Sequence, residues 1–293
     1  MAAHTEVRVR RRATESDELS ARRLLICTAL TIPLALGLVL TAAPYLYMVS
    51  ATFKVNSEIF TNDVSWIPPV WRPDNYVSLF EGRPYARWFL NTTIVAVGRM
   101  LLGLFLCSLA GFAFAKYDFP GRKPMFVFIL ATMMLPFQIM LVPLFLMVVT
   151  FGWIDNYLAL IVPFAAEAFG IFVLRQYMVS IPNELLDAAR IDGSGEFGLY
   201  WRIALPLARP GLGVMGILFF IHGWNDYLWP LIVLRDKTMM TVNLGIASLV
   251  GPYSNEYGML LAGATLGTIP ILIVFLAMQR QFIAGIMSGA LKG

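Results

Sequence analysis

Five polar side chains lie within stretches that are otherwise apolar, and their types are the ones that could do chemistry inside a membrane. They are Arg99, Glu167, His222, Asn225 and Asp226. Polar and ionisable groups are expensive to bury in lipid, so by default they mark a path for a polar solute. The sequence therefore predicts a candidate translocation path that includes Glu167, His222, Asn225 and Asp226.

Each of these residues also has a simpler structural interpretation. Glu167 falls in the middle of an apolar segment, and it either pairs with Arg99 or lines the path, unless the segment is misplaced. For Asp226, near the end of its segment, we favour a solvated helix end over a solute contact. For His222, on an otherwise apolar helix, we favour a packed or hydrogen-bonded core residue.

No catalytic or metal-binding constellation accompanies these residues. The sequence has no Gly-rich loop ending in Lys-Ser/Thr that would hold nucleotide phosphates, no paired metal-ligand spacing and only two histidines, His4 and His222. Cys27 and Cys107 lie in apolar segments, where cysteine acts as a small hydrophobic residue. We expect no catalytic residue, no metal and no cofactor bound by this chain.

The elements that must position the polar residues are membrane helices. The chain is 58% hydrophobic and 14% charged, whereas a soluble domain carries about 25% charge. Its apolar segments lack the alternation of barrel strands, so the predicted fold is all-α and polytopic. Six segments have the length of about 20 residues that a span requires: 24–49, 88–115, 125–149, 158–178, 212–234 and 259–278.

Basic residues set the expected orientation. With the N-terminus inside, the inner segments hold most of the arginines and lysines, as the positive-inside rule requires. Both termini are then cytoplasmic, and the net charge of +4 is a topology signal. No basic and aromatic cluster indicates a nucleic-acid partner. We expect a disordered cytoplasmic tail over residues 1–22, a transmembrane domain over 23–281 and a cytoplasmic tail over 282–293.

A charged insert separates the fourth and fifth apolar segments. Pro182 suits a first helical turn, and Gly193 suits a left-handed stop. Leu185, Leu186 and Ala189 share one side of the predicted helix. So short a helix is not stable alone and needs something to dock against. The alternative is an amphipathic connector lying on the lipid surface.

The spacing within this insert resembles the coupling loop, or EAA loop, of permease subunits of ABC importers. An acidic residue precedes two alanines, a glycine follows after three residues, and Ile-x-Leu-Pro follows after nine more. Asp187 stands where the usual residue is Glu. The resemblance assigns residues 180–209 to a coupling loop, with these partner-facing residues: Glu184, Asp187, Ala188, Ala189, Asp192, Gly193, Ile203 and Pro206.

Three further stretches are similar to the carbohydrate, maltose-type branch of that family. They are 111–121 (GFAFAKYDFPG), 224–231 (WNDYLWPL) and the ending 289–293 (GALKG). The ending resembles the tail of the second permease subunit, which implies that Gly289, Lys292 and Gly293 contact the ATPase subunits. A frayed end without a role is the alternative.

The resemblance implies a type I ABC importer permease fold in a bacterial cell membrane. It also implies a second permease subunit, two ATPase subunits that hold ATP and Mg²⁺, and an extracytoplasmic solute-binding protein that delivers a sugar. The rival function is a secondary, ion-coupled transporter that uses Glu167, and such a protein would have no use for a coupling loop. A membrane enzyme would need a nucleophile or a metal cluster, which the sequence does not offer.

Overall fold

The computed structural model describes the backbone of residues 2–61, 65–251 and 254–290, and the side chains of residues 27–61, 65–251 and 255–279. It divides into an N-terminal unit, residues 1–72, and a main body, residues 73–293. We describe the two separately.

The N-terminal unit consists of the long helix α1 (Ala2–Ala51) and the short helix α2 (Asn56–Ile59). Residues Cys27–Ala51 of α1 are apolar enough to cross a membrane, and their large side chains are exposed. The helix already includes residues 2–22, for which we expected a disordered tail. Arginine, glutamate and alanine are frequent there and have high helix propensity, so they can extend a helix that the apolar segment nucleates.

The chain after α1 folds back on that helix. The Lys54 side chain is 1% exposed, with its ammonium 4.9 Å from the centre of the Tyr47 ring, and it donates a hydrogen bond to the Ser65 carbonyl. Ser50 Oγ donates to the Trp66 carbonyl over 2.5 Å. A buried ammonium needs such partners, and here they hold Ser65 and Trp66 against the end of α1.

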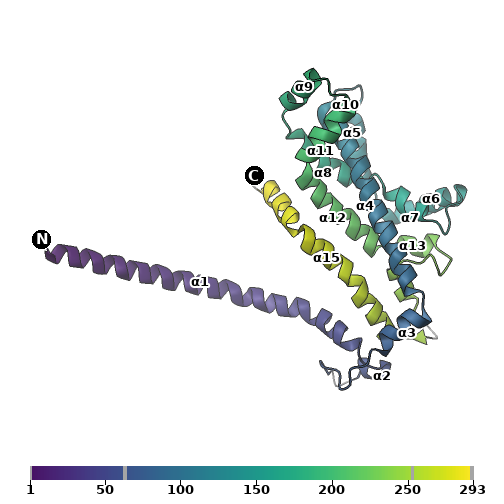
Figure 1. The fold of residues 1–293 in the computed structure, drawn as a ribbon, viewed down its shortest axis with the longest axis horizontal. Coiled ribbons are helices and arrows are strands. Elements are labelled where there is room, and N and C mark those ends of the chain that lie inside the picture. The colour runs from purple at the N-terminus through teal and green to yellow at the C-terminus, as the bar shows by residue number, and fades with distance from the viewer. Residues whose placement is uncertain (1, 62–64, 252–253, 291–293) are drawn as a thin grey trace. The chain divides into compact units, whose positions relative to one another are not determined.

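The main body is helical apart from one two-stranded hairpin within its described residues (Figure 1). Its elements in chain order are α3 (Asp74–Gly82), α4 (Tyr85–Lys116), α5 (Arg122–Thr132), α6 (Phe137–Thr150), α7 (Tyr157–Ile161), the 3₁₀ helix η1 (Val162–Phe164), α8 (Ala168–Val179), α9 (Asn183–Ile191), α10 (Glu196–Leu199), the π-helical turn η2 (Tyr200–Ala204), α11 (Leu205–Leu207), α12 (Arg209–Asn225), α13 (Leu228–Val233), α14 (Val242–Ala247), β1 (Val250–Gly251), β2 (Ser254–Asn255) and α15 (Tyr257–Ala290).

Only some of the candidate spans are continuous helices. Among the described residues, three continuous segments, Cys27–Ala51, Tyr85–Lys116 and Tyr257–Gln279, are long and apolar enough to cross a membrane. Three bent pairs pass the same test of length and composition: α5 with α6 at 102°, α7–η1 with α8 at 47°, and α10–α11 with α12 at 82°. Counting each pair as one span gives up to six, the predicted number, although α10 and α11 of the third pair lie in the charged insert and α12 supplies its apolar part. The fifth segment, 212–234, differs from the prediction because α12 ends at Asn225 and a separate helix, α13, follows.

Helix α4 is the centre of the body and packs against both α8 and α12. Three glycines permit this packing. A Cβ on Gly111 of α4 would lie 2.9 Å from the backbone nitrogen of Arg175 in α8, and one on Gly170 of α8 would lie 2.6 Å from the Phe219 ring of α12. A Cβ on Gly223 of α12 would lie 2.9 Å from the Ala96 Cα in α4. Small residues bring membrane helices into close contact in this way.

Replacing Gly223 by alanine is therefore expected to destabilise the body by about 1–3 kcal/mol, because the added methyl group overpacks backbone rather than a movable side chain. Gly216→Ala in the same helix is the matched control, since its Cβ would make an ordinary 3.5 Å contact with Leu104. Thermal unfolding of the detergent-solubilised protein measures both. Equal melting temperatures for the two variants would contradict the close packing.

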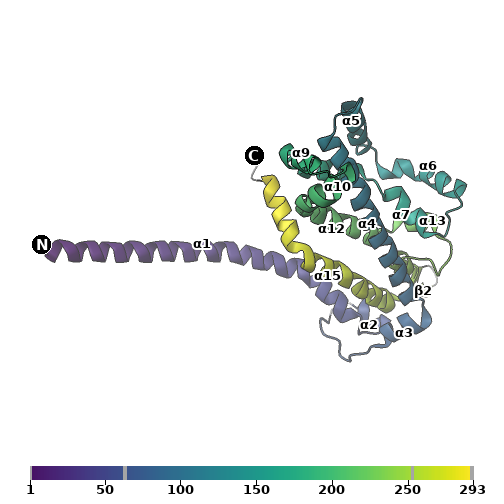
Figure 2. The ribbon, with the colours of Figure 1, turned by 45° about the horizontal axis from the view of Figure 1, so that its top comes forward.

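The two ends of the body differ. Helices α9 and α10 lie at the end opposite α3 in both views (Figures 1 and 2). The hairpin, with Val250 paired to Asn255 and Gly251 to Ser254, lies at the α3 end (Figure 2). The chain thus carries its charged insert at one end and its hairpin at the other.

Candidate functional site

An open cavity of about 460 Å³ lies among the helices of the body, with polar side chains set in a largely apolar lining. All four predicted path residues line this cavity. It therefore brings together side chains of α12, the residue that follows α12, and Glu167 at the break before α8. Its lining residues are Arg99, Phe137, Phe164, Glu167, Ile221, His222, Asn225 and Asp226. A concave site with apolar walls and a few convergent polar groups is the usual form of a small-molecule site.

Arg99 organises the wall of this cavity. Its side chain is buried, and its Nη2 lies 2.8 Å from Asp226 Oδ2. Its Nε donates to the Leu160 carbonyl over 2.5 Å, and the guanidinium carbon lies 3.9 Å from the centre of the Phe164 ring. The arginine thus links the end of α7 to the residue that follows α12.

The structure decides between the alternatives for Glu167 and contradicts the interpretation of Asp226. Of the two alternatives left open for Glu167, pairing with Arg99 is excluded, because the ion-pair partner of Arg99 is Asp226. The Asp226 side chain is only 16% exposed, so it is not a solvated helix end. Its other oxygen accepts a 3.4 Å hydrogen bond from the Trp229 backbone amide, near the start of α13. The reason is the end of α12 at Asn225, which turns Asp226 inward instead of continuing the helix.

Glu167 and His222 are neighbours on the cavity wall. Glu167 lies at the break between η1 and α8, where the two parts bend by 47°, and not within a continuous helix as predicted. Its Oε2 is 4.0 Å from His222 Nδ1, with side-chain exposures of 30% and 61%. His222 is therefore not the packed core residue that we favoured. Asn225, one turn further along α12, is also exposed.

The aromatic part of the wall was missed by the sequence analysis. Phe137 and Phe164 lie with ring centres 5.7 Å apart, and each also contacts the buried Trp229. Each phenylalanine directly follows a proline, Pro136 or Pro163, at the start of a helical segment. This repeated Pro-Phe sequence was the feature from which the aromatic wall could have been predicted. Together the rings give the cavity apolar surface beside its hydrogen-bonding groups.

The coupling segment, residues 180–209, is a structured projection at the α9 end of the body. Helix α9 ends as expected: the Gly193 amide donates to the Arg190 carbonyl over 3.0 Å, the Ser194 amide donates to Ala189 over 2.9 Å, and Gly193 has φ of 87°. These are the two hydrogen bonds of a Schellman motif. Gly193 thereby sets the direction in which the chain leaves α9.

A charge cluster holds α9 against α10. Arg190 pairs with Asp187 at 2.7 Å and with Glu196 at 3.0 Å, and the Tyr117 hydroxyl also donates to Glu196. Hydrogen bonds from Arg190 and Tyr117 lower the pKa of the Glu196 carboxyl. Asp187 keeps 62% of its side chain exposed, so it can serve both Arg190 and a partner.

The underside of the segment packs on α4. Leu186, Leu199 and Tyr200 are at most 2% exposed and cluster with Phe112. The Tyr200 and Ser108 hydroxyls hydrogen-bond over 2.8 Å. Leu185, which we grouped with Leu186, is instead 47% exposed. The segment therefore has its own dock on the body, unlike a connector that only lies on lipid.

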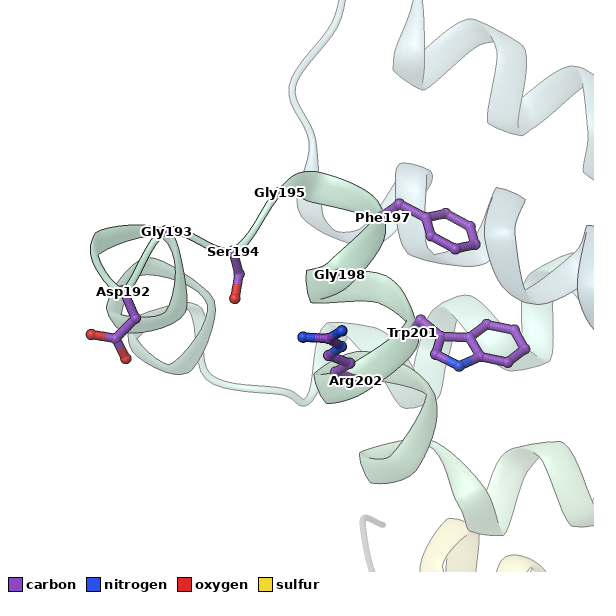
Figure 3. Close-up of a pocket in the computed structure, with 8 residues that line it drawn as sticks. All are labelled: Asp192, Gly193, Ser194, Gly195, Phe197, Gly198, Trp201 and Arg202. Atoms are coloured by element: carbon purple, nitrogen blue, oxygen red, sulfur yellow. The ribbon is translucent and has the colours of Figure 1, made fainter.

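Its outer surface is apolar in places that the sequence analysis did not single out. Ile191, Phe197 and Trp201 are 87%, 61% and 55% exposed. Phe197 and Trp201 project side by side with their rings 6.1 Å apart and nearly parallel, beside a pocket of about 490 Å³ (Figure 3). Exposed apolar side chains beside the charged groups of α9 and α10 make this surface a candidate contact site for a protein partner.

The other predicted partner-facing residues have mixed placements. Glu184, Ala188, Asp192 and Pro206 are exposed, and Ala189 and Ile203 are half-buried against the cluster under the segment. Of the predicted tail contacts, Gly289 belongs to α15 without a described environment, and Lys292 and Gly293 lie outside the described residues.

A bundle of broken apolar helices around a cavity lined in part by polar side chains, with a docked charged segment at one end, has the architecture of a membrane transport subunit. Residues 103–287 match the family model described as binding-protein-dependent transport system inner membrane component. The chain belongs to this family and is a permease subunit of an ABC importer with a polytopic, inner-membrane helical fold.

Individual relatives are similar over most of their length. The arabinooligosaccharides transport system permease protein AraQ of Bacillus subtilis (strain 168) is 43% identical over 227 residues, covering 77% of this chain and 81% of that protein. The lactose transport system permease protein LacG of Rhizobium radiobacter is 36% identical over 259 residues, covering 88% and 94%. A solved bacterial ABC transporter involved in import of the acidic polysaccharide alginate has the same fold, with a TM-score of 0.76, 22% identity, and coverage of 87% and 96%.

Proposed function

We propose that this chain carries a sugar across the membrane through the cavity lined by Glu167, His222, Asn225 and Asp226. The observation that carries the proposal is the pairing of hydrogen-bonding side chains with the Phe137 and Phe164 rings in one cavity. Sugars offer hydroxyls to the former and C–H faces to the latter. The relatives AraQ and LacG, named as sugar permeases, support the same class of solute.

Transport is powered by partner subunits. A binding protein on the outer side delivers the sugar, two ATPase subunits hold ATP and Mg²⁺, and a second permease subunit completes the pathway. The coupling segment docks in the ATPase subunits through Asp187 and the exposed Ile191, Phe197 and Trp201. That end is then cytoplasmic, as are both termini. Residues 289–293 extend between the ATPase subunits. Closure of the ATPase subunits rocks the two permease halves between inward-open and outward-open states.

Co-purification and transport together test this function. Pull-down of the tagged chain should recover a second permease and an ATPase subunit. Proteoliposomes of the complex should take up radiolabelled sugar only with ATP and the binding protein, and a protonophore should not slow the uptake. Uptake that needs an ion gradient, by a chain without ATPase partners, would favour a secondary transporter that uses Glu167.

The hairpin at the opposite end is expected to contact the binding protein. Shortening residues 250–255 should lower binding-protein-stimulated ATPase activity by about tenfold, a loss of roughly 1.4 kcal/mol of contact, and leave basal activity unchanged. Gly82→Ser is the control at the same end, because a side chain there meets open space. Unchanged stimulation after the shortening would show that the hairpin has another role.

A further inference from the structure

We propose that Glu167 makes the cavity selective for neutral saccharides and disfavours sugars that carry carboxylate or phosphate groups. The inference deepens the proposed function and rests on it, since it names the class of sugar and the residue that determines it. It follows from which charges around the cavity are already neutralised and which are not.

Arg99 is the one cation among the eight lining residues, and its charge is already neutralised by Asp226. Arg99 is 5% exposed, and its guanidinium is held by Asp226 at 2.8 Å, by the Leu160 carbonyl and by the face of the Phe164 ring. A paired and buried guanidinium interacts weakly with a second anion, because reaching that anion would break hydrogen bonds that it already makes. An anionic sugar therefore finds no free cation on this wall.

The carboxylate of Glu167 is not part of the ion pair between Arg99 and Asp226. Arg99 and Asp226 cancel, so with histidine counted as neutral the eight lining residues carry one net negative charge, that of Glu167. Its Oε2 is 4.0 Å from His222 Nδ1, beyond hydrogen-bond distance, and the side chain lines the cavity and is 30% exposed. A carboxylate accepts hydrogen bonds from sugar hydroxyls but repels a second anion.

Repulsion of this kind discriminates strongly in a cavity walled by phenylalanine. Charges near low-dielectric walls interact more strongly than charges in bulk water, and salt screens them less. Binding of a neutral sugar is not weakened by Glu167, because its hydroxyls can donate to the carboxylate. A uronate or sugar phosphate is repelled by this carboxylate, and no unpaired cation on the wall compensates. The inference is consistent with AraQ and LacG, whose names specify neutral sugars, and it separates this chain from the 32% identical sn-glycerol-3-phosphate permease UgpE of Brucella abortus (strain 2308), whose named solute carries a phosphate.

Equilibrium binding to the intact complex in nanodiscs, without ATP or binding protein, tests this selectivity. The probes are radiolabelled lactitol and lactobionate, which share a galactosyl group on an open six-carbon chain and differ only in having a CH2OH group or a carboxylate at C1 of that chain. We expect the wild-type complex to bind lactitol about tenfold more tightly than lactobionate. Glu167→Gln, which keeps the side-chain shape, should reduce the ratio to about twofold by tightening lactobionate binding alone.

Two further variants complete the design. Asn225→Asp adds a carboxylate to the same cavity and should weaken lactobionate binding by roughly another tenfold, which gives a second reading if Glu167→Gln does not assemble. Asp118→Asn, whose carboxylate is 98% exposed outside the cavity, should keep the wild-type ratio.

Three results would overturn the inference: equal binding of the two probes by the wild type, a ratio unchanged by Glu167→Gln, or binding of neither probe. If the same complex still took up a sugar with ATP and the binding protein, the proposed function would stand without this selectivity.

Discussion

Gly193→Pro is expected to abolish stimulated ATP hydrolysis and sugar uptake while the chain still enters the membrane. Gly193 has φ of 87°, and its amide donates to the Arg190 carbonyl. Proline fixes φ near −65° and has no amide hydrogen, so the turn after α9 cannot form, at a cost of about 3 kcal/mol or more. That cost reduces the population of the docking geometry by roughly a hundredfold. Stimulated ATPase activity of the reconstituted complex is the measurement.

Alanine substitutions at Gly193 and Gly195 separate backbone geometry from side-chain contact. Neither glycine has an atom within 4 Å of an added Cβ, but Gly195 has φ of −71°, which alanine adopts freely. Gly193→Ala should weaken coupling by about 1–2 kcal/mol, and Gly195→Ala should not.

Charge reversal by Asp187→Lys should also uncouple transport, since Asp187 is exposed and bridges to Arg190. Normal stimulation in Gly193→Pro would remove the coupling role of this turn.

Arg99→Met is expected to destabilise the body by about 3–5 kcal/mol, the cost of leaving one member of a buried ion pair alone. The change leaves Asp226, 16% exposed, without its cation, and leaves the Leu160 carbonyl without its donor. Thermal unfolding and the yield of assembled complex measure the loss.

The double variant Arg99→Met with Asp226→Leu should recover most of that stability but not transport, because it removes the charges from the cavity wall without leaving one unpaired. Asp118→Ala, which breaks the exposed pair with Arg122, is the control and should cost at most about 1 kcal/mol. Additive losses in the double variant would mean that the two residues act independently.

The spans could be predicted from the sequence because length and apolar composition alone determine them. The four path residues could be chosen for the same reason, since a polar group in an apolar segment stands out from its neighbours. Gly193 was predicted from local stereochemistry, and its positive φ confirms that prediction.

Helix breaks could not be placed in this way. Glu167 and Asp226 each follow a stretch that is apolar enough to continue as a helix, and tertiary contacts decide where the helix ends. The partner of Arg99 depended on those breaks, so the sequence analysis considered Glu167, and not Asp226, as its ion-pair partner. The exposure of Phe197 and Trp201 could not be predicted either, because the residue type does not distinguish an apolar side chain in the core from one on a contact surface.

The glycine contacts joining α4, α8 and α12 have a mechanical consequence. With Gly111 and Gly223 set against the backbones of neighbouring helices, the three helices cannot slide along one another without a collision. A movement of the coupling segment, which is docked on α4, is therefore transmitted to the cavity as a rigid-body rotation of the three helices and not as a gradual deformation. The 47° bend beside Glu167 and the end of α12 before Asp226 would be the hinges about which this rigid unit rotates. Stiffness between these hinges would let a small movement at one face of the membrane produce a larger opening at the other.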